Sequence, residues 1–212
     1  MTNIGKSREQ ICRLGESLFN RGFTVGSSGN ISVRLSDDRW LVTPTNACLG
    51  RLDPERLSVI DASGNLIDGD PPTKESFLHL AIYDQRPSDG AVVHLHSTHS
   101  VAVSLLPDVN PNQPVPPLTA YYVMKVRDLI LLPYYAPGDL SLANAVRAVA
   151  GKHHAVLLAN HGPIVSGKTV EEAVYASEEL EETSKLFLLL KDHKPRMLTE
   201  DQVLELKEKW HS

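Results

Sequence analysis

The chain has 212 residues, 42% of them hydrophobic, which suits one domain with a substantial core, so we expect a single domain over residues 1–212. The formal net charge is −5 and no run of Lys or Arg is longer than a pair, which argues against binding to a nucleic-acid backbone. The sequence has neither the apolar segment of a signal peptide nor the run of about 18 apolar residues that a membrane span needs, so we expect a cytoplasmic protein without membrane contact.

The first half of the chain is predicted to alternate between hairpins and helices. Ser7 and Gln10 have the spacing of a capping box, Asp37-Asp38 form a turn, and Thr73 could cap a helix. Apolar residues repeat with a helical period in some segments and alternate in others. In chain order, these patterns predict a helix over 7–22, a hairpin over 30–44, a second strand pair over 57–67, a helix over 73–86 and a strand over 91–96.

The second half begins with a Pro-rich stretch, residues 107–117, which we interpret as an ordered surface loop. Thr169 and Glu172 have the spacing of a capping box at the start of a long helix. The patterns predict a strand over 129–139, a helix over 140–152, strands over 155–162 and 163–167, a helix over 169–190 and a final helix over 199–210. Hairpins mixed with helices, instead of strict β-α-β alternation, favour an α+β fold with a largely antiparallel sheet.

The strand over 91–96 carries His94 and His96, whose side chains point to the same face because strand residues two apart do so. A divalent metal would satisfy both rings at once, but from spacing alone a metal site and a structural pair are equal alternatives. His161 follows an apolar run in a predicted turn, and is either the third ligand of an open zinc site or an ordinary turn histidine. Of the others, we expect His99 to be structural, His153 and His154 to be weaker ligand candidates, and His79, His193 and His211 to lie on the surface.

Three short polar segments are weak candidates for binding an anion. They are GSSGNIS at 26–32, TPTN at 43–46 and PPTKES at 71–76, and none matches a known phosphate-binding loop. The last places Thr73, Lys74 and Glu75 at a predicted helix start, where free N–H groups favour a phosphate. Glu75 is either a proton carrier or a first-turn acid stabilised by the helix dipole.

Five segments resemble, in order and spacing, the class II aldolase family that includes L-fuculose-phosphate aldolase and L-ribulose-phosphate 4-epimerase: GSSGNIS, TPTN, PPTKE, VVHLHSTHS and LLANHGPIV. The resemblance covers nearly the whole chain and favours the metal interpretation. It implies a three-layer α/β/α sandwich, and one zinc, or another divalent metal, held by His94, His96 and His161. Glu75 would carry a proton and could fill the open metal position without substrate. The family also implies a fourfold-symmetric homotetramer with active sites near subunit interfaces, and phosphate binding by Gly29, Asn30, Thr45, Asn46, Thr73 and Lys74.

Two segments depart from the sugar-phosphate aldolases of this family. This chain has Asn46 where they have Gly, and Thr73 and Lys74 where they have paired serines. These residues look closer to the branch described as 3-oxo-tetronate 4-phosphate decarboxylases. In that chemistry the substrate would lose CO2, leave a metal-stabilised enediolate and yield dihydroxyacetone phosphate, with Lys74 on the phosphate because a cation on the carboxylate would oppose CO2 loss.

Two other functions stay open from the sequence. One is retro-aldol cleavage or epimerisation of a neutral sugar phosphate, which Lys74 disfavours. The other is a non-catalytic binding module, since the same fold occurs in adducin-like proteins. Retention of the three histidines and Glu75 argues against the module, because a binding module needs neither a metal nor a proton carrier.

Overall fold

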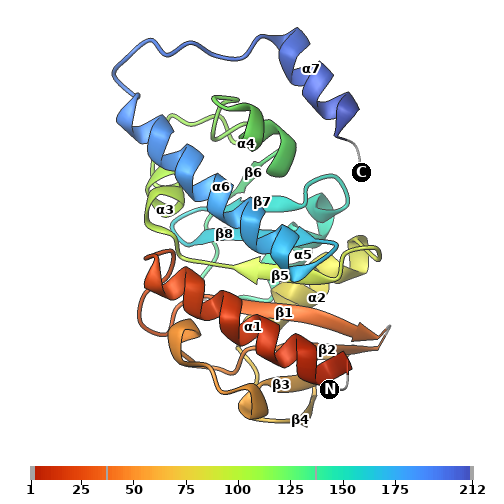
Figure 1. The fold of residues 1–212 in the computed structure, drawn as a ribbon. Helices are drawn as coiled ribbons and strands as arrows, with labels where there is room; N and C mark the ends of the chain where they lie inside the picture. Colours follow the sequence, from red (N-terminus) through yellow and green to blue (C-terminus); the bar gives the residue numbers. More distant parts are fainter. Residues whose placement is uncertain (1–2, 37, 137, 211–212) are drawn as a thin grey trace.

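The computed structural model describes residues 3–36, 38–136 and 138–210, and its centre is a sheet of eight strands in the order β4-β3-β2-β1-β5-β8-β7-β6 (Figure 1). All neighbouring strands are antiparallel except β6 and β7, which are parallel. This confirms the predicted α+β class and the largely antiparallel sheet. In the sequence the β6 segment is a short apolar run, which carries no sign of strand direction.

The elements in chain order follow the predicted alternation, with two short helices over 98–104 and 120–125 in addition to it. The strands are β1 (Asn30–Ser36), β2 (Arg39–Val42), β3 (Ser58–Asp61), β4 (Leu66–Asp68), β5 (Ala91–His94), β6 (Ile130–Leu132), β7 (Ala155–Leu158) and β8 (Gly162–Gly167). The helices are α1 (Asn3–Asn20), α2 (Ser76–Gln85), α3 (Thr98–Ser104), α4 (Ala120–Lys125), α5 (Ser141–Ala150), α6 (Val170–Leu189) and α7 (Glu200–Lys209). Two single-turn 3-10 helices, Leu49–Arg51 and Pro54–Arg56, join β2 to β3.

Helices cover both faces of the sheet, which confirms the expected three-layer sandwich. In Figure 1, α1 and α6 lie across one face, and α2 and α5 lie behind the other. Leu78 and Ile82 of α2 and Val146 of α5 share one buried cluster with the sheet. The opposite face packs against α1 and the start of α6, and its far end packs against α3, α4 and the middle of α6. The central strands are therefore buried on both sides, as β5 shows at every position.

Two predicted helix starts are wrong. The first helix begins at Asn3, so Ser7 is an internal residue and not its cap. Ile4 packs on the same cluster as Ile11, which extends the apolar stripe by two turns. The second begins at Ser76, not at Thr73, because the Thr73 N–H bonds to the Thr43 carbonyl (3.1 Å) and holds this residue in an extended segment.

Other boundaries differ by a few residues. The strand predicted over 91–96 ends at His94, and the one over 155–162 ends at Leu158. The strand predicted over 129–139 spans only Ile130–Leu132; Pro137 lies outside the described residues, as does Asp37 of the first hairpin turn. Thr169 caps its helix as predicted, and Thr199 caps the last helix at its predicted start. Among the described residues, no helix has the length and hydropathy to cross a membrane.

Candidate active site

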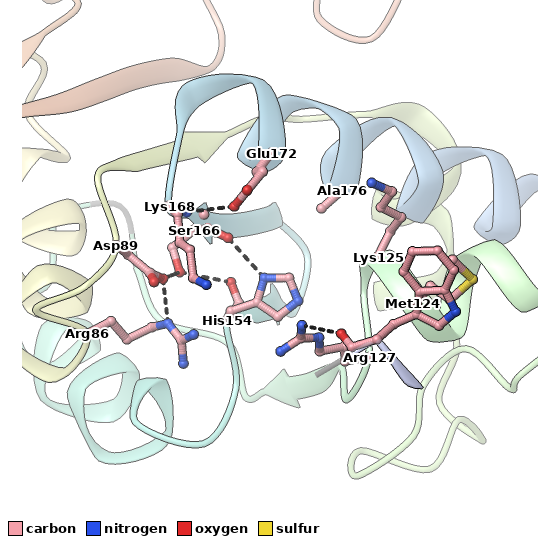
Figure 2. A pocket seen from close by; sticks show the side chains of 12 residues that line it. Arg86, Asp89, Met124, Lys125, Arg127, His154, Ser166, Lys168, Glu172 and Ala176 are labelled. Atoms are coloured by element: carbon pink, nitrogen blue, oxygen red, sulfur yellow. Dashed lines mark hydrogen bonds and ion pairs between the residues drawn. The ribbon is translucent and has the colours of Figure 1, made fainter. Parts of the chain in front are cut away.

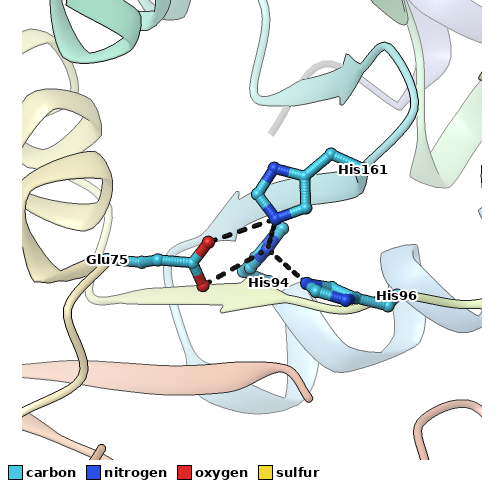
Figure 3. Close-up of side chains that lie close together, drawn as sticks. All are labelled: Glu75, His94, His96 and His161. Carbon is cyan, nitrogen blue, oxygen red and sulfur yellow. Dashed lines mark hydrogen bonds and ion pairs between the residues drawn. The ribbon is translucent and has the colours of Figure 1, made fainter. Parts of the chain in front are cut away.

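Three histidines converge where β5 ends in the middle of the sheet (Figure 3). His94 is the last residue of β5 and is fully buried between β1 and β8. Its Nδ1 lies 2.9 Å from the Pro163 carbonyl and donates to it, so Nε2 keeps its lone pair and faces the cluster. His96 follows two residues later, just past the strand, and His161 comes from the turn between β7 and β8.

The distances between these rings fit a shared metal ion. The Nε2 atom of His94 lies 3.1 Å from Nε2 of His96 and 3.2 Å from Nε2 of His161. Two nitrogens bound tetrahedrally to one zinc ion, each at about 2.0–2.1 Å, would lie about 3.3 Å apart. Lone pairs at this separation repel unless a cation or a proton lies between them, so the donor set fits a divalent ion.

Glu75 completes the cluster from the N-terminus of α2. Its Oε1 lies 3.1 Å from Nε2 of His161, and its Oε2 lies 3.6 Å from Nε2 of His94. The side-chain amide of Asn30 donates to Oε2 at 2.7 Å. Burial alone would raise the pKa of Glu75, but the hydrogen bonds from His161 and Asn30 hold this pKa well below its usual range. Glu75 is therefore a carboxylate, and one donor atom from each of the four side chains lies within 4.8 Å of the others.

The predicted phosphate-binding segments lie next to one another at the same end of the sheet. A bridge joins Pro44 to Pro72 and brings the segment of Thr45 and Asn46 beside that of Thr73 and Lys74. Gly29 directly precedes β1, and Asn30, its first residue, pairs with His94. Asn46 has a positive φ of 58°, a conformation that Asn tolerates better than most residues. Lys74 is exposed and makes no hydrogen bond or ion pair within the described part of the chain.

The comparisons with known proteins agree with this geometry. The family model described as Class II Aldolase and Adducin N-terminal domain matches residues 9–188. The chain belongs to the class II aldolase and adducin family. Its relatives are named decarboxylases and aldolases, which are lyases, and the chain is a lyase, as the resemblance of the five segments predicted.

Individual relatives in the class II aldolase family are similar over almost the whole chain. A protein of Haemophilus influenzae named 3-oxo-tetronate 4-phosphate decarboxylase is 49% identical, over 97% of this chain and 98% of its own length. An L-fuculose phosphate aldolase of Methanococcus maripaludis is 35% identical, over 87% of this chain and 96% of its own. The crystal structure of YgbL from Klebsiella pneumoniae superposes with a TM-score of 0.94 at 45% identity, covering 97% of this chain and all of that one.

A glycine allows the two histidine-bearing segments of this class II aldolase fold to approach. A Cβ on Gly162 would lie 2.2 Å from the Leu95 carbonyl oxygen, a backbone atom that cannot swing away. Gly162→Ala is therefore expected to destabilise the fold by about 1–3 kcal/mol and to move the neighbouring His161 out of reach of the metal. Thermal unfolding and metal content would test this. Gly151→Ala is the control, since its Cβ would meet nothing closer than 4.0 Å, and a similar metal loss there would contradict the argument.

The remaining histidines lie outside the cluster. His99 contacts Glu181 through its ring Nδ1 (2.8 Å), and its backbone N–H donates to the same carboxylate, which agrees with a structural role. The prediction that His79 lies on the surface is wrong: it is 1% exposed and lies beneath Asn30. The missed signal was its position four residues after Glu75, which places both on one face of α2. His153 is bonded to a backbone carbonyl away from the site, and His211 lies outside the described residues.

A separate cavity of about 190 Å³ is lined by His154, one of the weaker ligand candidates, and by none of the residues assigned to the metal, proton or phosphate (Figure 2). Its most central ring is that of His154, which lies between the carbonyls of Ser166 and Val126 (2.9 and 3.0 Å). Arg86 on its wall is paired with Asp89 at 2.5 Å. These groups already bond one another, whereas the Nε2 atoms of the His cluster face each other, so the cluster is the candidate active site.

Proposed function

We propose that this lyase is a zinc-dependent decarboxylase of a 3-oxo-tetronate 4-phosphate, which it converts to dihydroxyacetone phosphate and CO2. The observation that carries the proposal is the placement of a carboxylate, Glu75, against three imidazoles whose Nε2 atoms converge. The substrate assignment is supported by the 49% identical relative that bears this decarboxylase name and by Lys74. An assay of the purified protein that follows CO2 and aldehyde release separately tests the proposal.

The metal would be held by His94, His96 and His161, with Glu75 in the open position when substrate is absent. We assign the ion as zinc, and another divalent ion that prefers imidazole ligands would also fit the three histidines. When bound, it would act as a Lewis acid that stabilises negative charge developing on the substrate. Metal analysis after extensive dialysis tests this step, because a folded protein without metal that gains nothing from added zinc would favour an adducin-like binding module.

One of the chain's own residues can transfer the proton that the reaction requires. When the C1–C2 bond breaks, CO2 leaves without the bonding electrons, and the pair remains on the C2–C3 unit as an enediolate. A proton must then reach C2 to give dihydroxyacetone phosphate. Glu75 is the carboxyl group at the cluster; because it is ionised there, it would take up a proton from water and pass it to C2 once substrate has taken its place beside the histidines.

The phosphate would lie against the two bridged segments and the start of β1. We assign it to Gly29, Asn30, Thr45, Asn46, Thr73 and Lys74. Lys74 has no partner in the described structure, so its charge is available to an anion. It would bind the phosphate and leave the carboxylate free to depart, since a cation on the carboxylate would stabilise the ground state more than the transition state.

Lys74→Ser is expected to raise KM for the phosphorylated 3-oxo acid and to change kcat less, because it removes one charge from the anion pocket. Steady-state kinetics with the 3-oxo acid phosphate would measure both. If CO2 release also falls relative to aldehyde release from a sugar phosphate, Lys74 helps to select the reaction. Turnover and KM equal to those of the unmodified enzyme would remove Lys74 from the site.

The alternative reaction is retro-aldol cleavage or epimerisation of a sugar phosphate. It is favoured by the 35% identity to an L-fuculose phosphate aldolase, and the same cluster could stabilise the enediolate that either reaction leaves. Aldehyde release without CO2 release in the paired assay would select it.

We further propose one catalytic domain over residues 1–212, a cytoplasmic location and a homotetramer with a small phosphorylated sugar acid as substrate. A site shared between subunits would lose specific activity on dilution, as the tetramer dissociates. Light scattering combined with activity measurements across a dilution series tests this. A fully active monomer at working concentration would be incompatible with the shared site.

A further inference from the structure

Asn30 is held between Glu75 and a buried histidine on the far side. Its Nδ2 donates to Oε2 of Glu75 at 2.7 Å, and its Oδ1 lies 2.5 Å from Nε2 of His79. Beyond the ring, Nδ1 of His79 lies 2.7 Å from the Ser32 hydroxyl, which in turn lies 2.9 Å from the Tyr83 hydroxyl. Four hydrogen bonds therefore connect Glu75 to the interior of the layer between α2 and the sheet.

The donor and acceptor roles of these side chains give the series of hydrogen bonds one direction. A carboxylate only accepts, so Asn30 must turn its NH2 group to Glu75 and its carbonyl oxygen to His79. The carbonyl also only accepts, so His79 must carry its proton on Nε2. Its Nδ1 then has a lone pair, to which Ser32 donates, and the Tyr83 hydroxyl can donate to Ser32.

The surroundings of His79 keep this arrangement in place. The side chain is 1% exposed, so water does not compete for either ring nitrogen. Burial lowers the pKa of His79 to about 4, although the nearby Glu75 charge opposes this, and the ring is neutral at neutral pH. The neutral ring has one donor and one acceptor, which are the two roles that Asn30 and Ser32 require.

We propose that His79 is a positioning residue that fixes the amide orientation of Asn30, so that the active site meets only N–H groups at this position. One hydrogen of the amide holds Glu75, and the second remains for an oxygen of the substrate. The catalytic consequence rests on the function proposed above, whereas the orientation itself does not. Without His79 the amide can rotate by half a turn, and its oxygen then faces the Glu75 carboxylate, where two acceptors repel.

The tautomer of His79 can be measured without substrate or activity. In protein labelled with ¹⁵N at histidine, two-bond proton–nitrogen correlations report which ring nitrogen carries the proton. The His79 signals are identified by their loss in His79→Gln. We expect a neutral ring protonated on Nε2 at pH 7. A proton on Nδ1, or a charged ring at this pH, would overturn the assignment.

Kinetics then separate positioning from a merely structural role. His79→Met keeps the bulk and removes the donor, and is expected to lower kcat about 10–100-fold, the usual range for a partner of an active-site group, without loss of bound metal. His79→Gln, which can donate from a similar position, should recover most of this activity. His154→Gln is the matched control, a half-buried histidine outside the site that is hydrogen-bonded through both ring nitrogens, and should leave kcat per folded protein unchanged.

A double-mutant cycle gives the decisive comparison. If His79 acts through Asn30, adding His79→Met to Asn30→Ala should change kcat by no more than about twofold. Independent, multiplying effects of the two changes would contradict the proposal, as would full activity in His79→Met. If His79→Met does not fold, the tautomer and the His79→Gln kinetics still decide. If the unmodified protein releases no CO2 from the 3-oxo acid phosphate, the proposed substrate fails while the tautomer result stands.

Discussion

Replacing His94, His96 or His161 by alanine is expected to abolish tight metal binding and nearly all activity. Each replacement leaves two imidazoles at a site built for three, and an open zinc site needs three protein ligands. The Nε2 distances of 3.1 and 3.2 Å from His94 place this ring at the centre of the donor set, so His94→Ala should have the largest effect. Metal content after dialysis and turnover by each purified variant provide the measurement.

His99→Ala is the matched control for this series. His99 lies three residues beyond His96 but bonds to Glu181, so its loss should leave the metal in place. A ligand assignment is wrong for any histidine whose alanine variant still retains metal as tightly as the unmodified protein.

Glu75→Gln is expected to lower kcat by roughly 10²–10⁴-fold, the usual range for a lost general acid or base. The amide has nearly the shape of the carboxylate and its oxygen can still accept from Asn30, so the pocket should remain intact and KM should change little. Because the three histidines are untouched, the metal should remain bound. Steady-state kinetics and metal analysis on the same preparation measure these three quantities.

The comparison with Lys74→Ser makes this result specific. Loss at Glu75 should appear in kcat, whereas loss at the neighbouring Lys74 should appear mainly in KM. A fully active Glu75→Gln enzyme would exclude Glu75 as the proton carrier, and an equal effect of both variants on KM would point to a general disturbance of the start of α2.

Much of the fold could be predicted from local patterns. Helices such as α6 and α7 carry both an apolar stripe and a capping threonine, Thr169 or Thr199, so their starts were predicted correctly. The first helix start was missed because Ser7 and Gln10 offer the same local signal inside a helix as at its end. The parallel pairing of β6 with β7 depends on how distant segments meet, which a short apolar run does not encode.

The site shows the same division between local and distant information. The placement of His94, His96, His161 and Glu75 in one cluster agrees with the prediction, although their roles stay predictions. Local patterns suggested the first pair and offered His161 and Glu75 as candidates beside ordinary structural alternatives, and the five ordered segments of the family favoured the functional interpretation of all four. The burial of His79 was missed because a polar residue on a predicted helix is expected to face solvent unless the packing of that helix on the sheet is known. Its partners Asn30 and Ser32 lie more than 40 residues earlier in the chain.

The position of His94 at the end of a central strand has a consequence for how the metal would enter and leave. β5 is bonded along its length to β1 and β8, and the His94 ring is tied to Pro163, so this ligand cannot move without breaking the middle of the sheet. This ligand is therefore in place before an ion arrives, and its part in capture would require little reordering of the chain. Exchange of the ion should accordingly be governed by the dehydration of the incoming ion and by the movement of the more exposed ligands and of Glu75, which would fill the open position without substrate.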